Sequence, residues 1–221
     1  MPPPRMLAAI LVSLGVPAFA GGQTAQPQQR GPSPDQPLSV RVFAEAGMQT
    51  FVADDSFEAI TGDATGAIVG GGGEVLARGW FVRVGAGRYH AAGERVFLFE
   101  DEIFRLGIPL TVTVTPIEAS GGHHFRQVWR LVPYVGAGMG SYRYTETSVL
   151  AEAENDEDRR HWSAHVLAGA EFVVWGRLSG AAEFQYTRVA AGLGDDGVSD
   201  VFDERDLGGF AGRAKLVFRL W

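Results

Sequence analysis

A strict alternation of apolar and polar residues runs through most of the chain after residue 38, and no other feature constrains the fold as strongly. In 38–51 one face of the segment is apolar and carries Val40, Val42, Ala44, Ala46 and Met48. Successive side chains of a β-strand point to opposite faces, so a period of two predicts strands. We identify eight such segments, at 38–51, 66–77, 80–91, 109–125, 130–145, 160–173, 177–189 and 207–220.

The connections between these segments alternate in length. Short ones at 78–79, 126–129 and 174–176 separate long ones that all contain acidic residues, at 52–65, 92–108, 146–159 and 190–206. Short turns at one rim and long polar loops at the other are typical of an up-and-down membrane barrel with an even number of strands. The sequence therefore predicts an all-β fold, an eight-stranded antiparallel up-and-down transmembrane β-barrel over 38–221.

The fourth segment is the least regular. Its apolar parity shifts around Pro116, from Val112 and Val114 before it to Ile117 and Ala119 after it. A β-bulge inserts one extra residue and changes the parity of a strand, and proline is tolerated at bulges. We therefore expect a bulge near Pro116.

The first twenty residues have the three parts of an export signal. Arg5 precedes an apolar run over 6–12, and Ala18-Phe19-Ala20 supplies the small-x-small pattern of a cleavage site. The apolar run is shorter than the ~18 residues of a spanning helix. We expect a signal peptide over 1–20, cleaved after Ala20, and a flexible leader over 21–37, which is rich in Gln, Pro and Gly.

Composition excludes several classes of site. The chain has no cysteine, so neither a disulfide framework nor a thiolate metal site is available. The formal charge is −7, a poor match to nucleic acid, whose binding usually depends on a basic patch. The tetraglycine at 70–73 is followed by no Lys-Ser/Thr pair, so it is not a phosphate-binding loop, and we expect no cofactor.

Alternation alone does not say which face lies inside the barrel, because a soluble lipocalin-like barrel places its apolar face inside. Charged residues lie in mid-strand on the polar face, at Arg41, Glu45, Arg83, Glu171, Glu183, Arg213 and Lys215. The interior of an eight-stranded barrel is narrow and filled by side chains, so charges there must pair. We expect these seven residues to form a structural charge cluster in the lumen. Glycines on the same face, at 136, 138 and 140, would make room for larger neighbours.

Tryptophan positions favour the membrane barrel. Four of the five tryptophans lie where strands meet short turns, at Trp80, Trp129, Trp175 and Trp221. An indole ring is apolar with one polar N–H, which suits the interface between lipid and water. We expect these four residues to form an interfacial girdle at one rim.

Two stretches carry a resemblance to a known family, Leu131 to Gly140 (LVPYVGAGMG) and His165 to Phe172 (HVLAGAEF). Over roughly 38–221 the chain resembles the outer-membrane β-barrel domain family of small barrels, which includes OmpX and the membrane domain of OmpA. The resemblance implies a location in the bacterial outer membrane. It also implies insertion by the barrel-assembly machinery, which recognises the last strand in this family.

One short stretch suggests an enzymatic role. His161-Trp162-Ser163 resembles a fragment of the His-x-Ser element of lipid A deacylases, and Glu171 is a candidate to orient the histidine. The asparagine that follows the serine in those enzymes is Ala164 here, and both His161 and Ser163 fall on the lumen face. We therefore expect no catalytic site and no metal site, although a lipid A-modifying enzyme stays as a third alternative.

The sequence thus predicts an integral protein of the outer membrane with a structural or surface-interaction role. The alternatives are a narrow outer-membrane pore and a soluble periplasmic lipocalin-like carrier. The expected partners are outer-membrane lipid, lipopolysaccharide and the barrel-assembly machinery, and no nucleic acid.

Overall fold

The computed structural model describes residues 38–99, 102–148, 157–189, 204 and 206–221. The predicted signal peptide and leader lie outside the described residues, as does most of the long connection at 190–206. No helix within the described part of the chain is long and apolar enough to cross a membrane.

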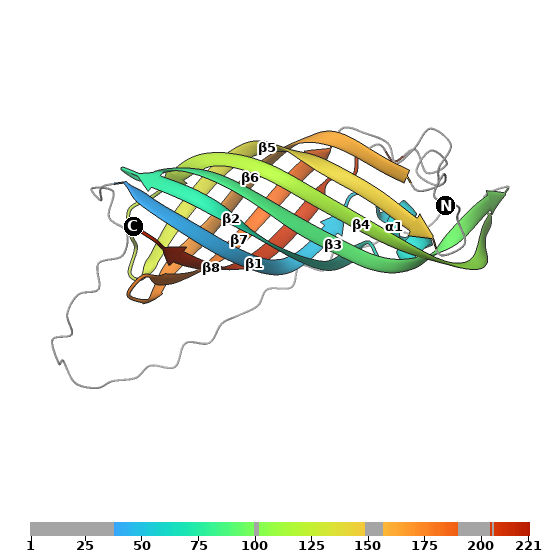
Figure 1. The fold of residues 1–221 in the computed structure, drawn as a ribbon, viewed down its shortest axis with the longest axis horizontal. Coiled ribbons are helices and arrows are strands. Elements are labelled where there is room, and N and C mark those ends of the chain that lie inside the picture. The colour runs from blue at the N-terminus through green and yellow to red at the C-terminus, as the bar shows by residue number, and fades with distance from the viewer. Residues whose placement is uncertain (1–37, 100–101, 149–156, 190–203, 205) are drawn as a thin grey trace, which may run out of the picture.

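The described chain forms a closed antiparallel barrel (Figure 1). Each strand pairs with its neighbours in chain order, and the last strand pairs with the first. This arrangement confirms the predicted fold class. The strands are β1 (Ser39–Phe51), β2 (Thr65–Ala77), β3 (Trp80–Phe99), β4 (Glu102–His124), β5 (Leu131–Ser148), β6 (Glu157–Trp175), β7 (Leu178–Val189) and β8 (Gly209–Arg219).

The stagger of the strands sets the tilt of the barrel. The stagger is found by following paired residues from strand to strand around the barrel. Starting at Val40 in β1, this path returns to β1 at Thr50, so the stagger is roughly ten residues. In a closed barrel of eight strands, this stagger goes with a strand tilt of about 40°. The interior is therefore narrow enough for side chains to fill.

Tight connections join the strands at one end of the barrel, which we call the turn rim, and the opposite end we call the loop end. Between β2 and β3 the chain reverses over Arg78 and Gly79, whose φ angles are 51° and 83°. Two consecutive positive φ angles match a type I′ turn, whose twist fits an antiparallel hairpin. The other short connections at this rim are 125–130 and 176–177.

The prediction of a long connection at 92–108 is wrong, because β3 and β4 continue through it as a paired hairpin. Their ladder runs out to Phe99 opposite Glu102, with one register shift between Glu94 and Val96. Figure 1 shows this hairpin projecting beyond the loop end. The connection predicted at 146–159 is likewise shorter than expected, since β5 ends at Ser148 and β6 begins at Glu157.

The bulge predicted at Pro116 is also wrong. Pro116 pairs with Tyr142 in an unbroken register between β4 and β5. The apolar parity changes for another reason: Val112 and Val114, each 1% exposed, point into the barrel, whereas Ile117, 55% exposed, points out. The interior is therefore apolar at the loop end.

This apolar interior is completed by a short helix, α1 (Asp54–Thr61), which lies within the predicted connection 52–65. The Phe57 ring stacks on the Phe51 ring at a centroid distance of 3.9 Å and meets Tyr89 edge-on. These side chains pack against others from several strands in one buried cluster, which includes Ile60, Leu110, Val112, Val114, Tyr142, Tyr144, Val189 and Leu207. The helix and this cluster together form an apolar plug at the loop end.

Candidate functional site

The charged side chains of the lumen form one continuous chain of ion pairs. The structure brings all seven sequence-predicted residues into it and adds Glu74 and Glu118. Cations and carboxylates alternate along the chain in the order Glu171, Arg41, Glu74, Arg83, Glu183, Lys215, Glu45, Arg213 and Glu118. We call this set the lumen network. Alternation gives each cation two carboxylate partners, which offsets the cost of burying its charge.

The centre of the lumen network is the most tightly packed part. Glu183 accepts hydrogen bonds from Arg83 at 2.5 Å and from the Tyr134 hydroxyl at 2.9 Å, and its other oxygen lies 2.7 Å from Lys215 Nζ. Arg83 also donates to Glu74 at 2.8 Å. The side chain of Glu183 is 1% exposed, so these partners replace water completely. Such a carboxylate is held in place by two hydrogen bonds and one ion pair.

The two ends of the network differ in what surrounds them. At the turn-rim end Arg41 joins Glu74 and Glu171, the latter at 2.8 Å. At the other end Arg213 reaches Glu118 at 3.4 Å, and Glu118 also accepts a hydrogen bond from Tyr142 at 3.0 Å. Tyr142 belongs to the apolar plug, so the network ends where the plug begins.

Sequence reasoning missed Glu74 and Glu118 for identifiable reasons. Glu74 follows the tetraglycine of β2, where the absence of side chains hides the alternation. Glu118 lies two residues after Pro116. In this stretch the apolar residues switch from the inward to the outward face, so the alternation alone does not show which face Glu118 is on. The signal that would have found both is charge balance, because the predicted cluster held four cations and three carboxylates.

Small residues on the lumen face leave room for rings, as the sequence suggested. A Cβ atom added at Gly138 would lie 2.6 Å from the ring of His165, and one added at Gly169 would lie 2.5 Å from the ring of Tyr134. Both distances are well below van der Waals contact. The glycines of β5 and β6 are therefore part of the packing of the lumen.

Little space remains between these side chains. A cavity of about 20 Å³ lies inside the lumen and is lined by Gln185 and by network residues that include Arg83 and Glu118. A single water needs about 10–15 Å³ of such volume, so this cavity holds about one. In the described part of the lumen, the charges therefore contact one another more than they contact water.

The structure does not assemble the candidate catalytic group His161, Ser163 and Glu171. All three lie on β6, and Glu171 is separated from His161 by roughly ten residues, or about 33 Å of strand. Glu171 pairs instead with Arg41 at the turn-rim end. His161 and Ser163 lie near the plug.

Another serine and histidine do meet in the lumen. Ser120 Oγ lies 2.8 Å from His165 Nε2, and His165 Nδ1 lies 3.8 Å from a carboxylate oxygen of Glu118. Both Ser120 and His165 are buried. The arrangement resembles a nucleophile with its base, but the neighbouring cavity of about 20 Å³ has no room for a substrate beside them. We interpret it as a structural hydrogen bond of the lumen.

The outer surface of the barrel is apolar over a defined height. Outward side chains in mid-strand include Val42, Val82, Val84, Val135, Met139, Val166, Phe184 and Leu216, and all are exposed. On β7 the apolar stretch ends at Arg188, and the roughly ten residues from Leu178 to Arg188 rise about 25 Å at ~3.3 Å per residue and a tilt of about 40°. This height equals the apolar band of outer-membrane barrels, about 25 Å.

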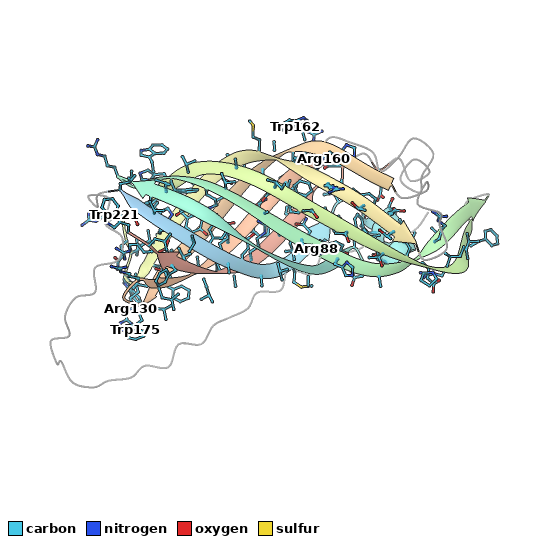
Figure 2. All side chains as sticks on the ribbon, viewed as in Figure 1. Arg88, Arg130, Arg160, Trp162, Trp175 and Trp221 are labelled. Atoms are coloured by element: carbon cyan, nitrogen blue, oxygen red, sulfur yellow. The ribbon has the colours of Figure 1, made fainter. Side chains whose placement is uncertain are left out.

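The four tryptophans of the predicted girdle all lie at the turn rim with their rings exposed. Their exposed fractions are 65% for Trp80, 93% for Trp129, 79% for Trp175 and 78% for Trp221. Figure 2 shows Trp175 and Trp221 at the turn rim, while Trp162 lies further along the barrel wall. The apolar band therefore has aromatic side chains near both of its edges.

Carboxylates gather at one place outside the lumen. Asp54, Asp55 and Glu204 offer oxygen atoms within 4.8 Å of one another at the start of α1. Glu204 already accepts hydrogen bonds from the backbone N–H groups of Asp55 and Ser56, at 3.1 and 3.0 Å. It thereby satisfies free donors at the N-terminus of α1, which is a sufficient structural reason for its position.

Comparison with known proteins identifies the fold. No protein-family profile and no curated protein sequence matches the chain. Among solved structures, the chain is similar to Neisserial surface protein A (TM-score 0.54, 15% identity, 82% of this chain and 96% of that one). It is also similar to a major outer membrane protein from Thermus thermophilus (TM-score 0.56, 11% identity, 83% of this chain and 99% of that one). The chain therefore has the fold of small outer-membrane β-barrels.

Proposed function

We propose that this chain is an integral β-barrel protein of the bacterial outer membrane with a structural or surface-interaction role. The observation that carries the proposal is the polarity of the two faces of the barrel. The outward face is apolar over about 25 Å, whereas four cations and five carboxylates face the lumen, and all of these except Glu45 and Glu118 are buried. A soluble carrier would have the opposite arrangement, with an apolar interior and a polar outer face.

The proposal includes a route and an orientation. Export by the signal peptide over 1–20 would deliver the chain to the periplasm, where the barrel-assembly machinery would act on β8 as the last strand. In outer-membrane barrels the short turns face the periplasm and the longer connections face outward. The loop end, with α1 and the β3–β4 hairpin, would then meet lipopolysaccharide and the cell surroundings.

The packed lumen favours this role over that of a narrow pore. Conduction needs a continuous water path, and the cavities of about 10–20 Å³ among the network side chains hold about one water each. The apolar plug lies between this network and the loop end. We therefore expect the purified barrel to show no steady conductance in a planar bilayer.

A labelling experiment tests the membrane location directly. The chain has no cysteine, so a single probe can be placed at Ala168→Cys, on the outward face of β6, or at Gln185→Cys, inside β7. A quencher carried on lipid acyl chains should reach a probe at position 168 and not one at position 185. Cold and boiled samples on SDS gels provide the control for folding, because a closed barrel resists cold SDS. Equal quenching at both positions, or protein that is soluble without detergent, would contradict the proposal.

A further inference from the structure

The turn rim carries positive charge in every one of its short connections. Arg78 lies in the turn 78–79, Arg126 and Arg130 lie in 125–130, and Arg177 lies in 176–177. All four side chains are exposed. None of these connections contains an acidic residue.

The four arginines have no carboxylate partner among the described residues. The nearest acidic side chains inside this end of the barrel are Glu74 and Glu171, which are buried and paired with Arg41. Arg177 donates one long hydrogen bond, of 3.5 Å, to the backbone carbonyl of Leu220. The guanidinium groups of the turn rim are therefore available to an anion from outside the chain.

The tryptophans fix the depth at which that anion would lie. Trp80, Trp129 and Trp175 occupy the same short connections or flank them, and Figure 2 shows Arg130, Trp175 and Trp221 toward the same end of the barrel. Exposed indole rings lie at the level of lipid headgroups, where their N–H can reach polar groups. Guanidinium groups bind phosphate through paired hydrogen bonds at the same level.

We propose that the turn rim is a binding surface for anionic phospholipid headgroups, which it selects over zwitterionic ones. The proposal rests on the proposed membrane location. These headgroups belong to the leaflet on the side of the membrane where the short turns lie. Around the rim the arginines lie on three separate connections, so the surface recognises a ring of annular lipids and not one lipid in a pocket. The apolar ring edges of the tryptophans contact the upper acyl chains of the same lipids.

The sequence provides a local reporter for this surface. Replacement of Trp162 by Phe leaves only the four turn-rim tryptophans in the chain. The full-length variant is folded into phosphatidylcholine vesicles that contain a minority of a second lipid brominated near the headgroup. In one arm this lipid is brominated phosphatidylglycerol, and in the other it is brominated phosphatidylcholine. Quenching of tryptophan fluorescence then measures which lipid surrounds the turn rim.

We expect phosphatidylglycerol to be enriched around the rim by about three- to fivefold over phosphatidylcholine, as judged from the relative quenching. The triple variant Arg78→Gln, Arg130→Gln and Arg177→Gln should remove most of this preference, since Arg126 is the one arginine of the four that remains. The corresponding lysine variant should keep most of it, because the charge is preserved. The preference should also fall at about 1 M salt, where the Debye length is about 3 Å.

A matched control removes the same number of charges from the other edge of the apolar band. Arg88, Arg160 and Arg188 are exposed and lie on the outward wall away from the turn rim (Figure 2 labels the first two). Their replacement by Gln should leave the quenching of the turn-rim tryptophans unchanged. Equal quenching by both lipids in the parent protein would overturn the proposal, and so would a preference that the triple Gln substitution leaves at its full size. A different result would contradict the proposed membrane location itself. In that case neither brominated lipid quenches the tryptophans, and the protein shows no heat-modifiable band.

Discussion

Removal of Glu183 provides the most direct test of the lumen network. The Glu183→Ala variant would leave Arg83, Lys215 and the Tyr134 hydroxyl without their shared acceptor, at distances now of 2.5, 2.7 and 2.9 Å. Loss of one partner from a buried ion pair costs about 3–5 kcal/mol, because the remaining charge stays buried. Arg83 keeps Glu74 and Lys215 keeps Glu45. We therefore expect a decrease in the free energy of unfolding of about 3–5 kcal/mol and not a larger one.

The assay is urea unfolding of the folded barrel in lipid vesicles, followed by tryptophan fluorescence. Glu58→Ala is the control, because Glu58 lies on the exposed face of α1, and an exposed substitution of this kind changes stability by about 0.5 kcal/mol at most. Glu183→Gln should lose less than Glu183→Ala, since the amide oxygen still accepts hydrogen bonds. If Glu183→Ala were no more destabilising than Glu58→Ala, Glu183 would be in contact with water and the interpretation of the lumen as a dry, paired network would fail.

Three further predictions, which use four substitutions, test other parts of the structure. Ala168→Arg, in mid-strand on the outward face, should cost about 2–4 kcal/mol of stability in lipid. Thr115→Arg lies near the edge of the apolar band and should cost only about 0–1 kcal/mol. Equal costs would argue against a bilayer around the barrel. Phe57→Ala should loosen the apolar plug by roughly 3–5 kcal/mol, detected as faster proteolysis of α1 while the barrel still resists cold SDS. Gly169→Val places a side chain against both the Tyr134 ring and the backbone carbonyl oxygen of Ala182, so it should lower the urea midpoint by an amount that corresponds to about 1–3 kcal/mol.

The closed barrel could be predicted because most of its strands alternate apolar outward residues with polar or small inward ones. In β1 the residues Val42, Ala44 and Ala46 all point outward, as their period of two requires. The short turns between strands then leave no topology other than neighbours in chain order. Strand ends were predicted less well at the loop end, because the alternation of apolar and polar residues is lost beyond the apolar band. The β3–β4 hairpin continues past Glu94 as a paired ladder out to Phe99 and Glu102.

The sequence also suggested most of the lumen network, because charges in mid-strand have to lie inside a membrane barrel. It could not show which charges pair. Arg41 and Glu171 are distant in sequence and lie on strands that are not neighbours, β1 and β6, so their contact depends on the width of the closed barrel. The same holds for Arg83 and Glu183, which join β3 and β7 across the lumen.

The apolar plug explains why a rule that assigns polar residues to the lumen fails over part of the chain. Inward positions at the loop end carry Val112, Val114 and Tyr144, and the same strands carry inward glutamates or glycines nearer the middle. A polar interior is required only where the wall itself lies in lipid and the charges can pair with one another. At the loop end the interior is an apolar core instead, and Phe57 of α1 completes it. This helix lies in a connection between strands, where the alternation pattern makes no prediction. The loop end is therefore organised like a small soluble core set on top of a charged lumen, and this division explains why one parity rule could not describe both.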